Sequence, residues 1–526
     1  MKRRDFLQAT IAGAAVGALP LRTHAIDPFE FENASIAGLQ EAMAQGRVTA
    51  KALVTAYLAR IDAMDRRGPS LGAIIQLNPD ALALAESLDR ERASGNVRGP
   101  MHGIPVLIKD NIATHDRMAT SAGSLALEGV IAPADAFIAA RLRTAGAVIL
   151  GKTNMSEWAN FRSTHSTSGW SGRGGQCRNA YALDRTPSGS SSGSATAVAA
   201  DFCTVAVGTE TDGSIISPAS VQSLVGIKPT VGLVSRSGII PIAHSQDTAG
   251  PMARTVADAA ALLSVLAGRD PRDAETGAAP AIDYTKSLDP GGLKGARLGI
   301  ARKKFFGHDA RTDALIAGAI DAMRSAGAVI IDPVDMPTTG QYDDGEFEVL
   351  LYEFKADLNA YLAGLGASAP VKSLADVIAF NERERARELR YFGQEIMLMA
   401  QKKGPLTTPA YRKTLARNRR LAGTEGIDAT VKRHRLDAIV VPTNAPPGFI
   451  DLVTGDHGAG GPSTTPAAVA GYPHVTVPAG YSFGLPVGIS FFGPAWSEPT
   501  LIRIAHAFER ATALRIPPRF LPTAEL

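Results

Sequence analysis

Cysteine is scarce in this sequence, since Cys177 and Cys203 are the only two among 526 residues. Two cysteines do not make the disulfide framework of a small secreted scaffold, and Cys203 lies in an apolar run that is typical of a core. Cys-x-x-Cys and His-Glu-x-x-His motifs are also missing. Because these spacings are common signals of metal sites, the sequence predicts no metal centre, and we expect no cofactor.

An excess of charge of one sign is absent beyond residue 25. The formal net charge of the chain is +3, and Lys2, Arg3, Arg4 and Arg22 against Asp5 account for all of it. The remaining residues carry 50 basic and 50 acidic side chains. This balance gives no electrostatic case for binding nucleic acid or anionic lipid.

A hydrophobic run of membrane-spanning length is missing from the N-terminus. The uncharged stretch 6–21 is short, and two glycines and a proline interrupt it. It follows adjacent arginines, and Thr23-His24-Ala25 offers small residues near a cleavage point. The arrangement resembles a twin-arginine export signal over residues 1–25, and the alternative is a frayed amphipathic N-terminus. We therefore expect a periplasmic or secreted protein that is not bound to a membrane after signal removal.

What the sequence does contain is a pair of serine clusters set among glycines. The first is Ser-Gly-Ser-Ser-Ser-Gly-Ser at 188–194, and the second is Gly-Thr-Glu-Thr-Asp-Gly-Ser-Ile at 208–215. The apolar run between them predicts a short helix followed by a buried strand at 202–207. The alternative, a flexible Gly/Ser linker, does not enclose a buried run. Both clusters therefore lie at the ends of core elements, where free N–H groups and hydroxyls suit acyl transfer.

Helical and strand patterns alternate along much of the chain. Residues 35–65 have a helical pattern, and 106–108 predicts a buried strand that is followed directly by Lys109. Lys109 pointing to solvent is the alternative to a buried lysine. The stretches 137–150 and 314–331 each predict a helix, a glycine stop and a strand. This alternation predicts an α/β layered fold.

The other stretches are less specific. Residues 269–295 are rich in Pro, Gly and Asp and predict a connecting segment. The charged helical region 381–403 is expected to present a solvated face. Residues 475–478 and 487–492 predict closing strands.

Hydrolysis of an amide needs a nucleophile, a base that later returns a proton, and donors for the oxyanion. A Gly-x-Ser-x-Gly elbow is formally matched at 189–193, but it requires a core strand before the serine, and the approach here is polar and ends in Pro187. A Ser-x-x-Lys arrangement is excluded, because no lysine has a serine three residues before it. A serine activated by a lysine through a second serine remains.

Three motifs in order resemble the catalytic motifs of the amidase signature family. They are Gly-Ile-Pro-Val-Leu-Ile-Lys-Asp-Asn with Lys109, the first serine cluster with Ser190, and the second with Ser214, which follows Ser190 by 24 residues. The resemblance covers about residue 36 to the C-terminus. It implies one domain over 26–526, with a large mixed central β-sheet covered by helices on both faces. The signature core is expected at about 100–260 and a helical insert at about 345–430.

The resemblance also implies roles and a Ser-Ser-Lys triad. Ser214 is the nucleophile, Ser190 the bridging serine after a cis peptide bond, and Lys109 the base. Burial favours the neutral amine of a lysine, which can accept a proton where an ammonium cannot. A histidine base such as His244 is the alternative. The expected oxyanion hole consists of the backbone N–H groups of Thr211, Asp212, Gly213 and Ser214.

The second cluster departs from the family's commonest pattern, Gly-Thr-Asp-x-Gly-Gly-Ser-Ile-Arg. Glu210 replaces the aspartate, Asp212 the first glycine and Ile216 the arginine. Without the arginine, Glu210 and Asp212 need other partners. These departures, with Ser-Glu-Trp-Ala-Asn-Phe-Arg at 156–162 and Ala-Trp-Ser-Glu-Pro at 495–499, resemble the peptide amidase branch. The resemblance implies removal of ammonia from C-terminal carboxamides without cleavage of internal bonds.

The substrate site is the least constrained feature. Trp158, Phe161 and Trp170 lie between the Lys109 and Ser190 motifs and are candidates for its walls, and ordinary core packing is the alternative for each. We expect a peptide or small-molecule amide substrate, no nucleic acid, and a monomer or homodimer. An amidase for aryl, aliphatic or other small amides is one alternative function. A non-catalytic solute-binding protein is the other, although it would not require the three motifs together.

Overall fold

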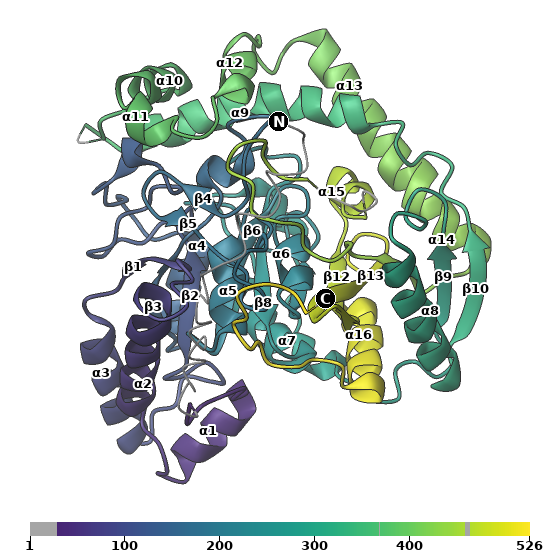
Figure 1. Ribbon diagram of the computed structural model, residues 1–526, viewed down its shortest axis with the longest axis horizontal. Helices are drawn as coiled ribbons and strands as arrows, with labels where there is room; N and C mark the ends of the chain where they lie inside the picture. Colours follow the sequence, from purple (N-terminus) through teal and green to yellow (C-terminus); the bar gives the residue numbers. More distant parts are fainter. Residues whose placement is uncertain (1–28, 368, 458–462, 526) are drawn as a thin grey trace, which may run out of the picture. The chain divides into compact units, whose positions relative to one another are not determined.

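A mixed sheet of 11 strands runs through the described part of the chain, in the order β1-β3-β2-β6-β8-β7-β12-β13-β11-β9-β10. Figure 1 shows this sheet with helices around it, so the predicted α/β fold with a large mixed sheet is confirmed. The strands of this sheet are β1 (Ile74–Leu77), β2 (Pro105–Lys109), β3 (Val148–Thr153), β6 (Val205–Glu210), β7 (Val225–Lys228), β8 (Thr248–Ala253), β9 (Arg297–Ala301), β10 (Val329–Val334), β11 (Ala438–Pro442), β12 (His474–Ser482) and β13 (Leu485–Phe492). A separate pair consists of β4 (Trp170–Ser171) and β5 (Gly175–Gln176).

The computed structural model describes residues 29–367, 369–457 and 463–525, and the expected export signal at 1–25 lies outside them. Two units are distinguished, Met1–Glu32 and Asn33–Leu526. In the described part of the first unit, the N–H of Glu32 donates to the carbonyl of Phe29 at 3.0 Å and closes a turn. All helices and strands of the described residues belong to the second unit. None of its helices within the described ranges combines the length and apolarity needed to cross a bilayer.

Helices account for much of the rest of the second unit. Before the sixth strand they are α1 (Ile36–Ala44), α2 (Ala50–Ile61), α3 (Ala81–Ala93), α4 (Phe137–Thr144) and α5 (Ser192–Ala199). After it they are α6 (Ile216–Val221), α7 (Val256–Leu266), α8 (Ala310–Ser325), α9 (Asp343–Gly364), α10 (Leu374–Arg383), α11 (Arg385–Glu388), α12 (Glu395–Gln401), α13 (Pro409–Arg419), α14 (Ala429–His434), α15 (Thr465–Ala470) and α16 (Glu498–Thr512). Shorter 3-10 and π turns are η1 (Asp62–Arg66), η2 (Leu125–Leu127), η3 (Glu157–Asn160), η4 (Ala274–Ala278), η5 (Tyr284–Ser287) and η6 (Arg420–Asp428).

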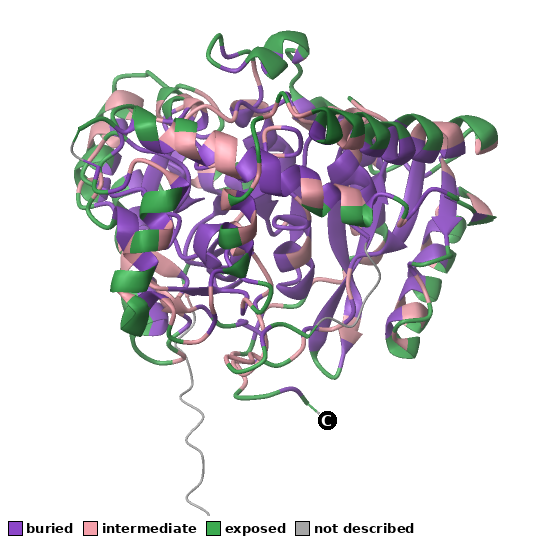
Figure 2. Cartoon of the chain, turned by 90° about the horizontal axis from the view of Figure 1, so that it is seen from above, coloured by how far each residue is buried: buried purple, intermediate pink, exposed green. Residues whose placement is uncertain are grey.

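The period of the apolar residues explains how a helix such as α2 docks. Leu53, Tyr57 and Ile61 recur every four residues, and all three are fully buried. Thr49 caps the start, because its side chain accepts a hydrogen bond from the N–H of Ala52 at 3.1 Å. Figure 2 shows the same division across the fold, with buried strands inside and exposed residues on the outer helices.

Two crossovers place helices on both faces of the sheet. Strand β2 lies between β3 and β6 and is parallel to both. The chain moves in one direction from β2 through α4 to β3, and in the other from β3 through α5 to β6. Because such crossovers are right-handed, α4 and α5 lie on opposite faces. The same arrangement brings the carboxyl ends of β2 and β6, and the residues that follow them, to one edge.

Three predicted strands differ in detail from the observed ones. The strand expected at 202–207 is observed as β6, which begins at Val205 and continues to Glu210. Thr209 and Glu210 stay in the strand because their side chains find buried hydrogen-bond partners. The predicted strands at 475–478 and 487–492 belong to β12 and β13, which pair antiparallel in the interior of the sheet.

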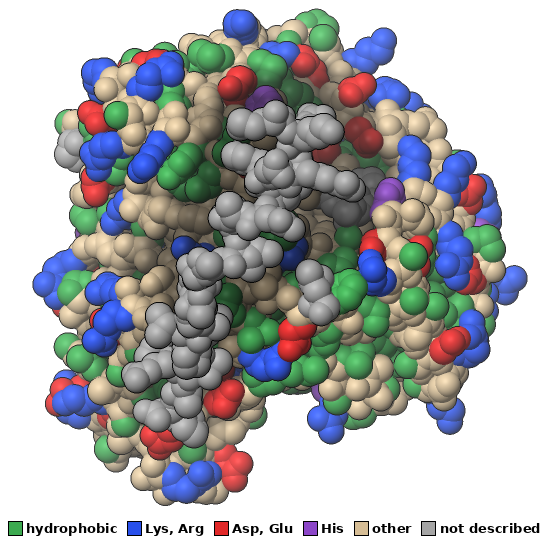
Figure 3. Space-filling model, viewed as in Figure 1, with side chains coloured by type: hydrophobic (Ala, Val, Ile, Leu, Met, Phe, Trp, Pro, Cys, Tyr) green, Lys and Arg blue, Asp and Glu red, His purple; other side chains and the backbone are tan. Residues whose placement is uncertain are grey.

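The segment between β10 and β11 is helical from α9 to α14. In Figure 1 these helices form the green arc beside the sheet. On the face seen in Figure 3, basic and acidic side chains are interspersed, which agrees with the balanced charge of the chain beyond residue 25.

Candidate active site

Lys109 ends strand β2 inside the protein. Its side chain is 0% exposed, so the alternative of a lysine pointing to solvent is wrong. The Nζ atom donates hydrogen bonds to Ser190 Oγ at 2.7 Å, to Thr209 Oγ1 at 2.9 Å and to the Thr209 carbonyl at 3.2 Å. Burial lowers the pKa of Lys109 to about 7, although the carboxylates of Glu210 and Asp247 act in the opposite direction. A lysine with this pKa is partly neutral at pH 7 and can accept a proton.

Ser190 lies just before α5, and its preceding peptide bond is cis. The residue is fully buried, and its carbonyl accepts a hydrogen bond from the N–H of Ser156 at 3.1 Å. Gly189 is required here by space, because a Cβ atom at this position would collide with the hydroxyl of Ser156. The bridging serine predicted from the sequence is therefore held directly against Lys109.

Ser214 follows β6, in the loop that leads into α6. The N–H of Ser191 donates to its carbonyl at 3.1 Å, which joins the two serine clusters. Gly213 has a φ of +79°, a left-handed conformation that favours glycine. No hydrogen bond joins the hydroxyls of Ser190 and Ser214 in the described structure, and no described residue accepts from the backbone N–H groups of residues 212–214. These three N–H groups are free to bind an oxyanion.

The two acidic residues that depart from the family pattern have partners within the fold. Glu210 Oε2 accepts hydrogen bonds from the N–H groups of Ile215 and Ile216 at 2.7 and 3.0 Å. It thereby satisfies N–H groups at the start of α6. Asp212 Oδ2 accepts from the hydroxyl of Thr465 at 2.7 Å. Burial raises the pKa of both carboxyls.

Asp247 is a site residue that the sequence analysis missed. Thr211 Oγ1 donates to its Oδ1 atom at 2.5 Å, while the N–H groups of Ile242 and Ala243 donate to Oδ2 at 2.8 and 2.9 Å. Burial raises the pKa of Asp247 to about 7. Asp247 thus ties the residue that opens the nucleophile loop to the segment before β8. No sequence motif signals a contact between residues 36 positions apart.

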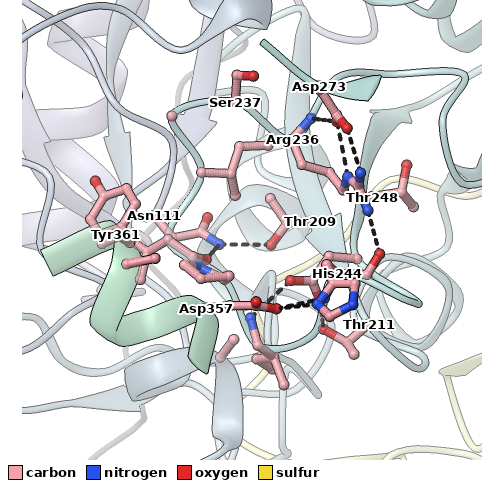
Figure 4. A pocket seen from close by; sticks show the side chains of 18 of the residues that line it. Asn111, Thr209, Thr211, Arg236, Ser237, His244, Thr248, Asp273, Asp357 and Tyr361 are labelled. Atoms are coloured by element: carbon pink, nitrogen blue, oxygen red, sulfur yellow. Dashed lines mark hydrogen bonds and ion pairs between the residues drawn. The ribbon is translucent and has the colours of Figure 1, made fainter. Parts of the chain in front are cut away.

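A pocket of about 490 Å³ adjoins this region (Figure 4). Its wall includes Thr209 at the end of β6 and Asn111, which lies two positions after Lys109. Asn111 Nδ2 donates to Thr209 Oγ1 at 3.0 Å. The labelled lining residues come from β6, from the loops after β2 and β6, from the segment between β7 and β8, from the start of β8, from the loop before η4 and from α9: Asn111, Thr209, Thr211, Arg236, Ser237, His244, Thr248, Asp273, Asp357 and Tyr361.

His244, the alternative base, is engaged elsewhere on the wall of this pocket. Its Nδ1 lies 2.8 Å from Asp357 Oδ2, and its Nε2 lies 3.6 Å from Glu353 Oε1. The hydrogen bond with Asp357 raises the pKa of His244. In the described residues these three side chains are a group that could hold a metal ion, with ligand atoms within 4.8 Å of one another. However, Tyr411 already donates to Glu353 Oε1 at 2.7 Å. We therefore interpret the contacts of His244 with Glu353 and Asp357 as ion pairs.

The three aromatic residues proposed as substrate walls are all largely buried. Trp158 and Phe161 belong to a core cluster that packs on α9, and the rings of Phe161 and Phe354 are 5.1 Å apart. The guanidinium of Arg162 lies 5.0 Å from the Trp170 ring centroid. None of the three lines the pocket of Figure 4. Their role as substrate walls stays a prediction.

The charged region 381–403 corrects one expectation. Several of its charged residues are exposed as predicted, but Glu388 is fully buried. Glu388 Oε1 accepts a hydrogen bond from the N–H of Leu125 at 2.7 Å. The backbone carbonyl of Glu388 accepts one from Arg162 Nη1 at 2.7 Å. Arg162 is also paired with Glu157 on η3. The carboxylate of Glu388 points inward because Arg162 is itself buried and needs anionic partners.

Comparisons with known proteins agree with this geometry. The model of the Amidase family matches residues 52–502. A probable amidase of Arabidopsis thaliana is 44% identical over 505 residues, which cover 94% of this chain and 93% of that protein. A putative amidase of Arthroderma benhamiae is 39% identical over 495 residues, which cover 91% of this chain and 81% of that protein. The solved peptide amidase of Stenotrophomonas maltophilia is 52% identical, with a TM-score of 0.90, and the match covers 94% of this chain and 100% of that chain. The chain therefore belongs to the amidase signature family and is a hydrolase that acts on amide C–N bonds.

Proposed function

We propose that this enzyme hydrolyses the C-terminal carboxamide of peptides and amino-acid amides to a free acid and ammonia. The observation that carries the chemistry is the buried 2.7 Å contact between Lys109 Nζ and Ser190 Oγ. The substrate class is supported by the likeness to the peptide amidase of Stenotrophomonas maltophilia over nearly the whole chain. The expected export signal supports a periplasmic location for the mature enzyme.

In the proposed reaction, the hydroxyl oxygen of Ser214 attacks the carboxamide carbon. Its proton passes to Ser190, and the proton of Ser190 passes to the neutral amine of Lys109. The N–H groups of residues 211–214 bind the oxyanion that develops on the carbonyl oxygen. The relay then runs in reverse and protonates the nitrogen, the C–N bond breaks, and ammonia leaves an acyl-enzyme on Ser214. Water, deprotonated through the same relay, releases the acid.

The pH dependence of the rate follows from the burial of Lys109. Because burial lowers its pKa to about 7, the neutral amine predominates above that pH and the ammonium below it. We expect kcat/KM to fall about tenfold per pH unit below pH 7 and to level off in mildly alkaline solution. Rates measured from about pH 5 to 9 test this. A rate that requires a group to be protonated near neutrality, with imidazole-like titration, would contradict Lys109 and favour His244.

The substrate proposal is tested by mass spectrometry on matched peptides. We expect a peptide amide to gain about one mass unit, because –NH2 is replaced by –OH, and the same peptide as a free acid to remain unchanged. The free acid is the matched control, since it shares every internal bond. Internal fragments from either peptide would exclude a specificity for C-terminal carboxamides. Inactivity on both, with turnover of anilides or short fatty amides, would favour the alternative of an amidase for aryl or aliphatic amides.

A further inference from the structure

Helix α9 presents three acidic side chains to the segment that precedes β8. Glu346, Glu353 and Asp357 are spaced by seven and four residues, so they lie on one face of the helix. Each accepts a hydrogen bond from a different residue of that segment. The donors are Gln246 Nε2 to Glu346 Oε1 at 2.8 Å, the Ser245 N–H to Glu353 Oε2 at 3.0 Å, and the His244 N–H to Asp357 Oδ2 at 2.9 Å.

Glu346 has a second contact, which reaches the nucleophile loop itself. Its carboxyl lies near the carboxyl of Asp212, whose negative charge adds to burial in raising the pKa of Glu346. The Oδ1 atom of Asp212 is enclosed, and it has no hydrogen-bond partner among the described residues. Two neighbouring buried carboxylates repel each other, and this favours a proton held by the pair. A protonated Glu346 supplies the donor that Asp212 Oδ1 lacks.

The two contacts of Glu346 converge on the predicted oxyanion hole. Asp212 provides one of the free N–H groups that precede Ser214, and its side chain is held by Glu346 and Thr465. Gln246, whose amide donates to Glu346, also donates to the carbonyl of Thr211 at 3.4 Å. Misplacement of oxyanion donors by even an ångström reduces the rate strongly. Glycine, the family's commonest residue at position 212, would have no side chain for such a contact.

We propose that Glu346 is a positioning residue for the oxyanion hole, which it holds by sharing a proton with Asp212 and by fixing Gln246 against Thr211. This inference rests on the proposed function, because it takes the free N–H groups of residues 212–214 as the oxyanion donors. Glu346 acts through the loop and does not contact the reacting atoms.

The shared proton makes this support sensitive to rising pH. Burial raises the pKa of both carboxyls, so the pair is complete below the ordinary carboxyl range and is lost as pH rises through the raised values. Asp343 on α9 faces the pair and also favours protonation, while Lys228 on β7 opposes it for Asp212. Glu210 at the end of β6 and the hydroxyl of Tyr342 also lie within electrostatic reach of the pair. Thr465 donates to Asp212 from the start of α15. Once both carboxyls are ionised, their mutual repulsion separates the side chains of Glu346 and Asp212.

Variants of Glu346 test the proposal on whichever amide the wild type hydrolyses. We expect Glu346→Ala to lower kcat about 10-fold to 100-fold with little change in KM. The affinity for a peptide aldehyde, which adds to the nucleophile and generates an oxyanion, should fall by the same factor as kcat/KM. Glu346→Gln should remain within about threefold of the wild type near pH 7, because its amide donates to Asp212 and accepts from Gln246. It should also lack the alkaline fall in rate that we expect of the wild type above the mildly alkaline plateau, once rising pH has ionised the carboxyl pair.

Glu348→Ala is the matched control, since Glu348 lies on the same helix and pairs with Lys403 at 2.6 Å. It should leave all these quantities unchanged. The proposal is overturned if Glu346→Ala keeps full kcat, or if it loses rate without losing aldehyde affinity. If Glu346→Ala does not fold, Glu346→Gln and Asp212→Asn decide, because persistence of the wild-type alkaline fall in both would also overturn it. Failure of the wild type on peptide amides would contradict the substrate proposal and leave these comparisons measurable on another amide.

Discussion

Replacement of Ser214 by alanine is expected to lower kcat by about 10⁶-fold, to the detection limit of ammonia release. The substitution removes one oxygen atom, the only group positioned in the proposed mechanism to form the acyl-enzyme. The loop should keep its conformation, because its contact with Ser191 uses the backbone carbonyl of Ser214. The measurement is steady-state ammonia release, combined with covalent labelling of the wild type by a serine-directed phosphonate.

Ser220→Ala is a suitable control for that experiment. Ser220 is a buried serine on α6 whose hydroxyl has no hydrogen-bond partner among the described residues. Its loss should leave the rate nearly unchanged. A Ser214→Ala enzyme that keeps more than about a hundredth of the wild-type rate, or a phosphonate adduct on another serine, would contradict Ser214 as the nucleophile.

Replacement of Lys109 by methionine is expected to be nearly as severe, with a loss of about 10³-fold to 10⁵-fold in kcat. Methionine fills most of the buried volume but cannot accept a proton. Because the proposed relay acts as a unit, the double variant with Ser214→Ala should be no slower than Ser214→Ala alone. Ser190→Ala should be severe but leave some rate, and full activity there would mean that Lys109 contacts Ser214 directly. The check is kcat across the set.

Lys152→Met separates this effect from the loss of any buried charge. Lys152 is also fully buried, and its Nζ donates to Thr120 Oγ1 at 2.9 Å. Burial lowers its pKa to about 8. The Lys152→Met protein that folds should keep the activity and the pH dependence of the wild type. If Lys109→Met retained that same pH dependence, the rise in rate would not be due to Lys109.

Much of the arrangement around the nucleophile could be predicted because it follows from local patterns. The apolar run before Lys109 predicted β2, and the run after Ser190 predicted α5 and the strand β6. The start and end of β6 could not be read in the same way. Hydrophobicity ends at Val207, yet the strand continues because Thr209 and Glu210 are satisfied by Lys109 and by the N–H groups that begin α6.

The contacts of Asp247 and Glu346 could not be predicted from the sequence, for a different reason. Asp247 and Glu346 lie 36 and 134 residues from their partners Thr211 and Asp212, and no spacing rule links carboxyls across such distances. The sequence did indicate that Asp212 needed a partner, because it stands where the family commonly has glycine. It could not indicate that the partner would be another acid. A carboxyl pair becomes plausible only when burial and the neighbouring threonines are known.

The ion pair between Arg162 Nη1 and Glu388 Oε2, 3.7 Å apart, limits how freely the helices between β10 and β11 can be exchanged by recombination with a relative. A chimera that imports a different sequence around position 388 without a carboxylate would leave a guanidinium enclosed with one of its counter-ions removed. Breaking a buried ion pair in this way costs about 3–5 kcal/mol, a large fraction of the stability of a typical domain. Crossover points for such chimeras should therefore keep residues 157–162 and 385–392 from the same parent.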